Sequence, residues 1–309
     1  MDTKILKSIT KIVALSFALL LTSCYEDAFQ ENFDYTSVYL AHETIDRTFI
    51  IGEGMQIGVG VTLGGTINNT KDIEVTFSLD DDLVTNAGKS VLLNNYYELV
   101  DSEGNPANNK IIIPAGKVQG FVYVKANEDE FLADSESLNH NYALGFTLES
   151  VINADIILTD PEDEESTKYK SSVISFSYIN QLYGNYVQTG QYTTTIGGVD
   201  ETSQYSGGIT DVDALELTMI SPTTVECNGV ANLRNSDTKM NIVLGDDNTI
   251  TLETAAGGVT IVDDGSTYNP ETRELTLNYS FESDGISYKA TDVLEFRNRV
   301  VDGVNQIGI

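Results

Sequence analysis

The sequence lacks tryptophan and is poor in proline, cysteine, histidine and basic residues. Its 309 residues include 5 Pro, 2 Cys, 2 His and 17 Lys+Arg against 47 Asp+Glu, which gives a formal net charge of −30. A surface this negative repels phosphate groups. We therefore expect no nucleic-acid partner and no binding to anionic lipid headgroups. Two Cys and two His also leave little with which to build a redox or metal centre. We therefore expect neither a cofactor nor a metal site.

The residues that are present indicate a folded, β-rich protein. Hydrophobic residues make up 41% of the chain and charged residues only 21%, which is a globular and not a disordered composition. Gly (25) and Tyr (16) are frequent, and together with Thr, Val and Ile they favour turns and strands over helices. The length predicts two domains of ordinary size.

The first 24 residues are typical of a bacterial lipoprotein leader. Lys4, Lys7 and Lys11 precede the apolar run Ile12–Leu21, which is too short to span a membrane. The segment ends in Leu21-Thr22-Ser23-Cys24, which resembles a lipobox. We predict that residues 1–23 are a signal peptide and that Cys24 becomes the acylated N-terminus, anchored by its lipid chains. The alternative is a plain secretory signal with an incidental cysteine.

The residues behind the lipidation site bear on location. Tyr25-Glu26-Asp27 resembles the surface-export signal of Bacteroidetes lipoproteins, although a solvated linker would have a similar composition. The expected location is the outer membrane, lipid-anchored and facing the exterior. Cleavage would remove three Lys and one Asp, leaving 14 basic and 46 acidic side chains and a charge of −32. Cys227 is then the remaining thiol, and it is expected to be a small buried hydrophobe.

A tether over residues 24–34 is expected to lead into a β-sandwich over residues 35–180. Short segments there alternate apolar and polar residues and are separated by Gly, Asn and Asp, which indicates an antiparallel sandwich. Asn94–Val100 and Glu128–Ala133 could each hold a helical turn or two, and residues 160–170 form a solvated acidic loop. The predicted strands are Met55–Leu63, Asp72–Leu79, Lys110–Ile113, Gly120–Lys125, Asn141–Leu148 and Ser172–Tyr178.

Residues 181–309 are predicted to form an antiparallel β-meander. About eight strands with short links favour closure into a lipocalin-like barrel, because closure removes exposed strand edges; a second sandwich is the alternative. Gly245–Asn248 and Asp263–Ser266 are predicted hairpin turns. The predicted strands are Tyr186–Thr195, Leu215–Ile220, Thr223–Ala231, Lys239–Leu244, Thr249–Glu253, Val259–Val262, Glu274–Ser280 and Ser287–Phe296.

Several short motifs resemble two-domain Bacteroidetes cell-surface lipoproteins whose parts are domains of unknown function. They include Asp82-Leu83-Val84, Tyr96–Leu99, Ile111–Lys117, Gly120–Val124, Tyr183–Gly190, Tyr268–Thr272 and, most specifically, Phe296–Val304. The resemblance implies an Ig-like first domain, a barrel-like second domain and an association with glycan-utilisation loci. It implies no binding residue that can be carried over to this chain.

The acidic and histidine residues give no motif for catalysis or metal binding. Asp80-Asp81-Asp82 and Glu128-Asp129-Glu130 each follow a strand, but adjacent acids point in different directions and match no calcium loop. They are expected to be solvated loop tips. His42 and His140 stand alone in the sequence, and no motif fixes a pair of carboxylates for glycoside cleavage. We therefore expect a protein that is not an enzyme.

Tyrosine is the residue type best placed to bind a ligand. Sugars pack their CH faces on aromatic rings, and the sixteen Tyr partly compensate for the absence of Trp. Tyr183, Tyr186, Tyr192 and Tyr205 cluster in the sequence and are the candidate ligand-binding residues, although each could be an ordinary half-buried sheet residue. Tyr96 and Tyr97 must face opposite ways in a strand, so one of them could be exposed.

These observations favour a surface-exposed lipoprotein that binds polysaccharide or host glycan non-catalytically, together with glycan-uptake proteins. Two other hypotheses stay open. One is an adhesin or structural component that contacts a protein partner, with the sandwich as a spacer. The other is a barrel that holds a small apolar ligand in its interior.

Overall fold

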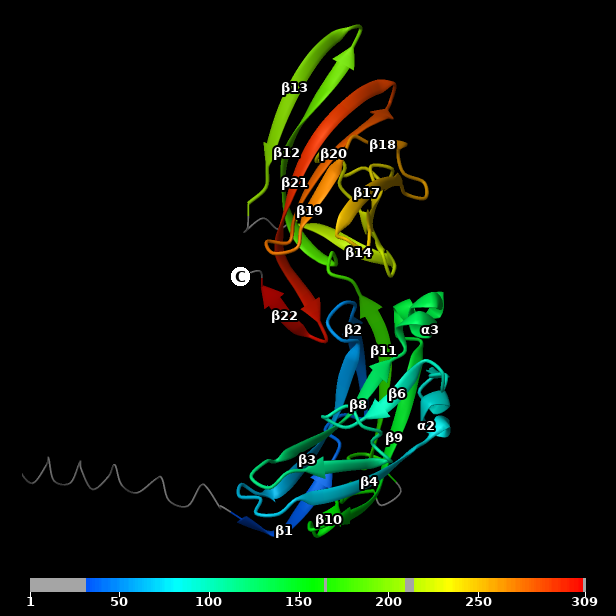
Figure 1. Cartoon of the computed structure of the whole chain (residues 1–309), viewed down its shortest axis with the longest axis vertical. Helices are drawn as coiled ribbons and strands as arrows, with labels where there is room; N and C mark the ends of the chain where they lie inside the picture. The colour runs from blue at the N-terminus through cyan, green and yellow to red at the C-terminus, as the bar shows by residue number, and fades with distance from the viewer. Residues whose placement is uncertain (1–31, 164–165, 209–213, 308–309) are drawn as a thin grey trace, which may run out of the picture.

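A computed structural model describes residues 32–163, 166–208 and 214–307. The predicted Cys24 lipidation site and the signal peptide lie outside these residues. The chain is all-β apart from a few short helices, as predicted, and its two parts are stacked along the long axis of the molecule (Figure 1). Among the described residues, no helix is long and apolar enough to cross a membrane.

The first part is a sandwich of two sheets. One sheet has the order β10 (Ile156–Ile157), β1 (Asn32–Tyr39), β3 (Gln56–Thr66), β8 (Gln119–Ala126) and β6 (Tyr97–Val100). The other has the order β2 (Thr44–Ile50), β11 (Ser171–Ile179), β9 (Tyr142–Ile152), β4 (Ile73–Leu79) and β7 (Lys110–Ile113), with β5 (Ser90–Val91) also paired to β9. β1 begins at Asn32, before the end of the expected tether.

The sheets are mixed, which corrects the expectation of a purely antiparallel sandwich. β1 pairs with β10, β2 with β11 and β5 with β9 in parallel orientation, while the other pairs are antiparallel. The first two parallel pairs join strands far apart in the sequence, so periodicity alone carries no information about their direction.

Aromatic rings from one sheet and from the helical segment after β8 pack together in the core of the sandwich. Phe49 stacks on Phe176 with ring centroids 5.5 Å apart and meets Phe131 edge to face at 5.4 Å. All three side chains are at most 1% exposed. This cluster and the alternating Val and Ile residues of the strands make the core of the sandwich.

Three short helices lie between strands of the sandwich. α3 (Glu128–Ala133) confirms one predicted helical turn, and η1 (Ser135–Asn139) follows it. α2 (Asp81–Asn86) was not predicted; the Asp80 carboxylate caps it by accepting from the backbone N–H of Asp82 and Leu83. The proposal of a helical turn over Asn94–Val100 was wrong in its second half, since Tyr97–Val100 is strand β6.

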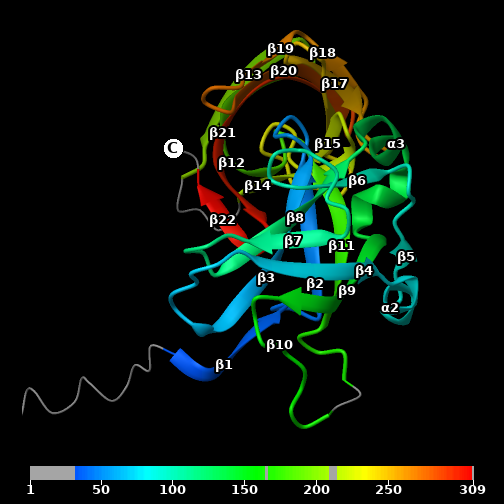
Figure 2. The ribbon, with the colours of Figure 1, turned by 60° about the horizontal axis from the view of Figure 1, so that its bottom comes forward.

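The second part is a closed antiparallel barrel. Its strands are β12 (Gly184–Ile196), β14 (Leu215–Ser221), β15 (Thr224–Cys227), β16 (Met240–Leu244), β17 (Thr249–Thr254), β19 (Ser266–Asn269), β20 (Glu274–Ser283) and β21 (Ile286–Val301). Each pairs with the next, and β21 pairs back to β12, so the ring closes; Figure 2 shows the ring end on. The barrel was therefore the right choice over a second sandwich.

Three further strands extend this barrel. β13 (Val199–Ser206) adds to β12, β22 (Val304–Ile307) adds to β21, and β18 (Ile261–Asp263) adds to β20. Three predicted strands had the wrong bounds. β15 ends at Cys227 and the chain turns at Ala231 and Asn232, which have positive φ; β18 begins only at Ile261, and β21 runs on to Val301. The predicted hairpin turn at Gly245–Asn248 is confirmed, since it joins the paired strands β16 and β17. The hairpin predicted at Asp263–Ser266 was wrong, because β18 and β19 both pair with β20 and not with each other.

Apolar side chains fill the barrel. Leu217, Val225, Met240, Ile242 and Leu277 are fully buried there, in a core that is separate from that of the sandwich. A filled interior argues against the hypothesis of an apolar ligand held inside the barrel.

Polar contacts join the two parts. β21 extends beyond the barrel toward the sandwich, where Arg299 Nη2 lies 2.9 Å from Glu53 Oε1 and Arg47 Nε lies 3.3 Å from Asp302 Oδ2 (Figure 1). The short link Asn180–Tyr183 connects β11 to β12. The opposite end of β12 and β21 is therefore the end of the barrel remote from the sandwich.

Candidate functional site

A row of aromatic rings crosses the strands at the remote end of the barrel. Tyr205 on β13 lies 6.2 Å from Tyr192 on β12, measured between ring centroids, and Tyr192 lies 5.6 Å from Tyr288 on β21. Tyr288 then stacks on Phe281 of β20 at 4.6 Å, with the two ring planes only 6° apart. We call Tyr192, Tyr205 and Tyr288 the tyrosine row.

The exposure of these rings decreases toward the core. Phe281 is 3% exposed and Tyr279, next to it, is fully buried. The tyrosine row is half-buried, so each of its rings keeps some surface in contact with solvent. The core supports the row from one side and leaves the other side accessible.

Polar side chains share the face of the tyrosine row. Directly paired residues of antiparallel strands lie on the same face, and Ser203 pairs with Tyr192, while Glu201 pairs with Thr194. Glu201 is exposed, and Ser203 and Thr194 are half-buried. Aromatic rings, hydroxyls and a carboxylate are thus presented together.

A buried carboxylate lies beneath the row. Asp292 on β21 is 0% exposed, and its Oδ2 accepts a hydrogen bond of 2.6 Å from the Tyr279 hydroxyl. Its Oδ1 accepts a hydrogen bond from the Tyr205 hydroxyl. Burial raises the pKa of Asp292 to about 7, and hydrogen bonding from Gln188 and the Ala231 backbone opposes that rise. Asp292 therefore titrates far above the range of an ordinary aspartate.

Glycine makes this contact between strands possible. Gly190 of β12 lies between Tyr205 and Asp292 in the register. A Cβ at position 190 would lie 2.8 Å from the Tyr205 hydroxyl oxygen and 2.3 Å from the Thr291 carbonyl oxygen. Only glycine leaves room for Tyr205 to reach across its neighbouring strand.

A polar cleft opens in the barrel wall below the row, where β13 and β14 diverge from β12. It has a volume of about 730 Å³. The Gln188 side chain accepts a hydrogen bond of 2.7 Å from Arg234 Nη2 and donates one of 2.9 Å to the Gly229 carbonyl. Asn228 and Asn232 also line the cleft.

The structure brings together two of the four predicted tyrosines. Tyr192 and Tyr205 are in the row, whereas Tyr186 is fully buried and donates its hydroxyl to the Leu182 carbonyl at 3.0 Å. Tyr183 lines a separate cleft between the two parts of the chain. The tyrosine row and the carboxylate beneath it thus include residues that were not among the predicted site residues.

The missed residues are Tyr288 and Asp292. Tyr288 is distant in sequence and joins the row only through the closure of the barrel by β12 and β21. The sequence does contain a signal for Asp292. It lies in an alternating segment, on the same face as the apolar residues Ala290 and Leu294. An acid on an apolar face indicates a buried polar group.

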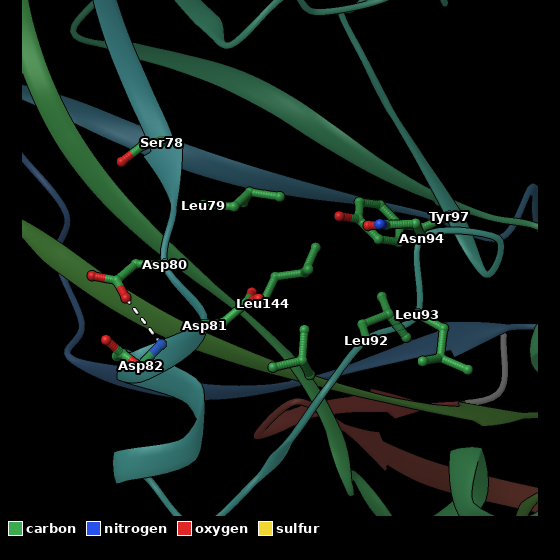
Figure 3. Close-up of a pocket in the computed structure, with 11 residues that line it drawn as sticks. Ser78, Leu79, Asp80, Asp81, Asp82, Leu92, Leu93, Asn94, Tyr97 and Leu144 are labelled. Carbon is green, nitrogen blue, oxygen red and sulfur yellow. Dashed lines mark hydrogen bonds between the residues drawn. The ribbon is translucent and has the colours of Figure 1, made fainter.

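A second hollow of ≈ 620 Å³ lies on the sandwich (Figure 3). Leu79, Leu92, Leu144 and Tyr97 line it from different segments, and Leu93 at its edge is 47% exposed. As Tyr96 is 9% exposed and Tyr97 half-buried, Tyr97 is the ring of this pair that faces solvent. We call this hollow the sandwich groove.

Acidic residues border the sandwich groove. Asp81 and Asp82 are exposed at its rim, and a neighbouring hollow that shares Tyr97 is bordered by Glu98 and Glu128. Among the residues that the structure describes, no group of three or more His, Cys, Asp and Glu side chains could hold a metal ion. Asp80 is occupied as a helix cap and is not a solvated loop tip as expected.

The side chains of His140 and Cys227 are held within the fold, His140 by contacts with hydroxyl groups and Cys227 by complete burial. The His140 Nε2 atom lies 2.8 Å from Ser177 Oγ and 3.3 Å from Thr48 Oγ1, and burial lowers the pKa of the imidazole. Cys227 is fully buried, as predicted, and burial raises the pKa of its thiol to about 12. This thiol stays protonated at neutral pH and is a poor nucleophile.

Comparison with known proteins places the fold. A family model described as "-like, N-terminal domain" matches residues 31–155. A Bacteroides ovatus structure of unknown function is 18% identical, with a TM-score of 0.70, and the match covers 90% of this chain and 99% of that chain. No curated protein matches the sequence.

Two other solved structures from Bacteroides ovatus match over similar lengths. One is of unknown function, with 13% identity, a TM-score of 0.38, and coverage of 89% of this chain and 100% of that chain. The other is a multidomain protein including DUF1735, with 12% identity, a TM-score of 0.37, and coverage of 87% and 97%. The first likeness, at 0.70, shows a shared fold, and the two lower scores add nothing to it.

Proposed function

We propose that this protein is a surface-exposed lipoprotein that binds complex glycans without catalysis and serves a polysaccharide-uptake system. The observation that carries the proposal is the tyrosine row, in which three half-buried rings stand side by side on one face. The resemblance of the sequence to Bacteroidetes surface lipoproteins supports the same function.

The row has the chemistry of a sugar platform. Pyranose rings present CH groups that pack on aromatic faces, and their hydroxyls need donors and acceptors at the edge of the platform. Ser203, Thr194 and Glu201 supply hydroxyl and carboxylate groups on the same face. A row of several rings suits a chain of sugars better than a single small molecule.

The charges around the row favour an uncharged glycan. Asp200, Glu201, Glu282 and Asp284 are exposed on the two hairpins that carry the row, with Lys289 as a basic residue among them. Sulfate or uronate groups would be repelled there, and the net charge of −30 acts in the same direction. Neutral polysaccharides are therefore the ligands that we expect.

Calorimetry on the purified protein with a panel of neutral and acidic polysaccharides tests the proposal. We expect binding of at least one neutral glycan and a loss of about tenfold in affinity for Tyr288→Ala, corresponding to about 1–2 kcal/mol of stacking. Tyr35→Ala is the matched control, since Tyr35 is 50% exposed on the sandwich. Absence of binding to every glycan would overturn the proposal.

The lipid anchor has its own test. Cys24→Ala should block lipoprotein processing and release the protein from the membrane fraction, because the acyl chains supply the attachment. Radiolabelled palmitate incorporation and membrane fractionation measure both effects. Labelling and membrane attachment that survive the substitution would show that Cys24 is not the anchor.

The sandwich groove favours a second candidate function, a protein-binding adhesin or structural component. Its exposed Leu93 and half-buried Tyr97 form an apolar surface, which is typical of protein contacts. Pull-down from outer membranes with wild type and Leu93→Ser tests this alternative. A partner that is retained by wild type and lost by Leu93→Ser, in a protein without glycan affinity, would favour it.

A further inference from the structure

We propose that Asp292 is the positioning residue of the tyrosine row and makes glycan binding depend on pH. The carboxylate touches no ligand itself; it holds the Tyr205 ring, which in turn packs on Tyr192. The inference rests on the proposed function and adds to it a control of the same site.

Tyr205 connects the buried carboxylate of Asp292 to the surface of the barrel. Asp292 is fully buried, yet Tyr205, whose hydroxyl donates to Asp292 Oδ1, is half-buried and belongs to the row. The contact crosses the intervening strand above Gly190, where nothing larger than hydrogen fits without displacing a neighbour. A change at the carboxylate is therefore transmitted to a ring that meets solvent.

Only one of the two tyrosine partners of Asp292 is free to respond when the carboxylate is protonated. The Tyr279 oxygen accepts a hydrogen bond of 2.6 Å from the Ala231 backbone N–H, and this fixes its hydroxyl as a donor to Asp292 Oδ2. When Asp292 is ionised, its two oxygens accept from both tyrosines. When it is protonated, the new proton must reside on Oδ1 and point to Tyr205, whose hydroxyl then has to turn away or accept.

Side chains from three other strands face Asp292. Tyr279 faces it from β20, Tyr205 from β13 and Gln188 from β12. Behind these are the Ala231 N–H on Tyr279 and the Arg234 guanidinium on Gln188. Cys227 lies near Tyr279 and is neutral, because burial raises the pKa of its thiol to about 12. Asp292 is thus the group of this set that changes charge near neutral pH, since burial raises its pKa to about 7.

The hydrogen bonds of Asp292 predict that glycan affinity falls as the pH is lowered. Above pH of about 7 the ionised carboxylate holds Tyr205 through a charge-assisted hydrogen bond; below it this bond is lost or replaced by a weaker neutral one, and the ring is held less firmly. We expect the affinity for a neutral glycan to fall by about three- to tenfold on acidification, as for the loss of one charge-assisted hydrogen bond.

A measurement without ligand tests the positioning role by itself. With ¹³C-labelled tyrosine, the Tyr205 ring signal, assigned by its loss in Tyr205→Phe, should shift with a midpoint near pH 7 in wild type. In Asp292→Asn the signal should not titrate in this range. A Tyr205 signal that is independent of pH in wild type would overturn the inference, whatever the protein binds.

The second measurement uses a neutral glycan that the calorimetric panel has shown to bind. Tyr205→Phe keeps the ring but removes its hydroxyl, so its affinity should match that of acidified wild type and lose its pH dependence. Gly190→Ala should also weaken binding, because the added methyl group displaces Tyr205. Asp246→Asn, in a turn at 245–248 away from the row, is the control that should keep the wild-type pH profile.

The outcomes separate the inference from the function on which it rests. If wild type binds no glycan, the proposed function fails, while the tyrosine signals still decide the role of Asp292. If wild type binds and Tyr205→Phe retains both the affinity and its pH profile, the positioning role is wrong and the function stands. If Asp292→Asn does not fold, Tyr205→Phe and Gly190→Ala still decide the question.

Discussion

The two parts of the molecule each contain an aromatic cluster, and the two clusters are exposed to different degrees. In the sandwich, Phe49 and Phe176 of one sheet meet Phe131 of helix α3, and all three are at most 1% exposed. In the barrel, the tyrosine row continues from the buried ring of Phe281 and ends on half-buried Tyr205. The first cluster is entirely core, and the second continues from the core to the surface.

The difference follows from how each fold ends its sheets. The sandwich encloses its rings completely, so aromatic area there contributes only to stability. The barrel strands β12 and β21 continue into hairpins beyond the segment of β12 that pairs with β14 (Figure 1), and the tyrosine rings on this extension are half-buried. Aromatic residues on that extension are supported from one side and remain available to a ligand from the other.

Phe49→Ala should give the largest effect of these substitutions, and that effect should be on the free energy of unfolding and not on glycan affinity. Removing a fully buried ring from the sandwich core costs about 3–5 kcal/mol, because lost burial and the resulting cavity add together. Urea unfolding followed by circular dichroism measures this cost. Glycan affinity of the folded protein should change by less than about twofold, as the sites are distant; a larger change would break the distinction between the clusters.

Asp292→Asn should change how the barrel responds to pH. The folded-state pKa of Asp292, about 7, lies above its ordinary value of 3.8, so the folded state binds more protons between these values. This group therefore makes wild type more stable as pH falls from about 7 toward about 4, by at most about 4 kcal/mol, and the gain is lost as pH rises through 7. Unfolding free energies of wild type and variant over this range measure the difference. Parallel pH profiles would contradict the assignment of a raised pKa.

Tyr192→Ala should have the opposite signature to Phe49→Ala. The ring lies between Tyr205 and Tyr288, so its loss should weaken neutral-glycan binding by at least about tenfold. Stability should fall by only about 1–2 kcal/mol, since the side chain is half-buried. Calorimetric titration and thermal unfolding of the same preparation provide both numbers. Unchanged affinity would remove Tyr192 from the site.

Tyr35→Ala should give the smallest effect. Tyr35 is 50% exposed on β1 and belongs to neither aromatic cluster, so its removal should alter stability by about 0.5 kcal/mol or less. Its glycan affinity should equal that of wild type. A loss as large as that of Tyr192→Ala would mean that any exposed tyrosine serves, and the row would have no special role.

Much of the fold could be predicted from the sequence because its strands alternate clearly. Segments such as Ile73–Leu79 and Glu274–Ser283 bury about every second residue, which is the pattern of a strand. The barrel was predicted from the number of such strands in the second part of the chain and from the short links between them. The helix at Asp81–Asn86 is too short for its period to be visible. The parallel pairing of β2 with β11 joins residues about 130 positions apart, and local patterns do not encode such pairings.

The candidate site could be predicted only in part, for a related reason. Tyr192 and Tyr205 lie on one hairpin, so their proximity in sequence becomes proximity in space. Tyr288 joins them through the closure of the barrel, which depends on register. Tyr186 has the same alternation as Tyr192, but it lies deeper in the barrel, where its ring is fully buried. Position along the barrel axis therefore decides which tyrosines can meet a ligand.

The central claim is that a glycan binds on the tyrosine row. The most direct measurement is a titration of ¹³C-tyrosine-labelled protein with the neutral glycan that shows the strongest calorimetric signal. We predict saturable shifts of the Tyr192, Tyr205 and Tyr288 ring signals with one common affinity, while the Tyr35 signal stays unchanged. Shifts confined to tyrosines of the sandwich, with the row unaffected at saturation, would contradict the account.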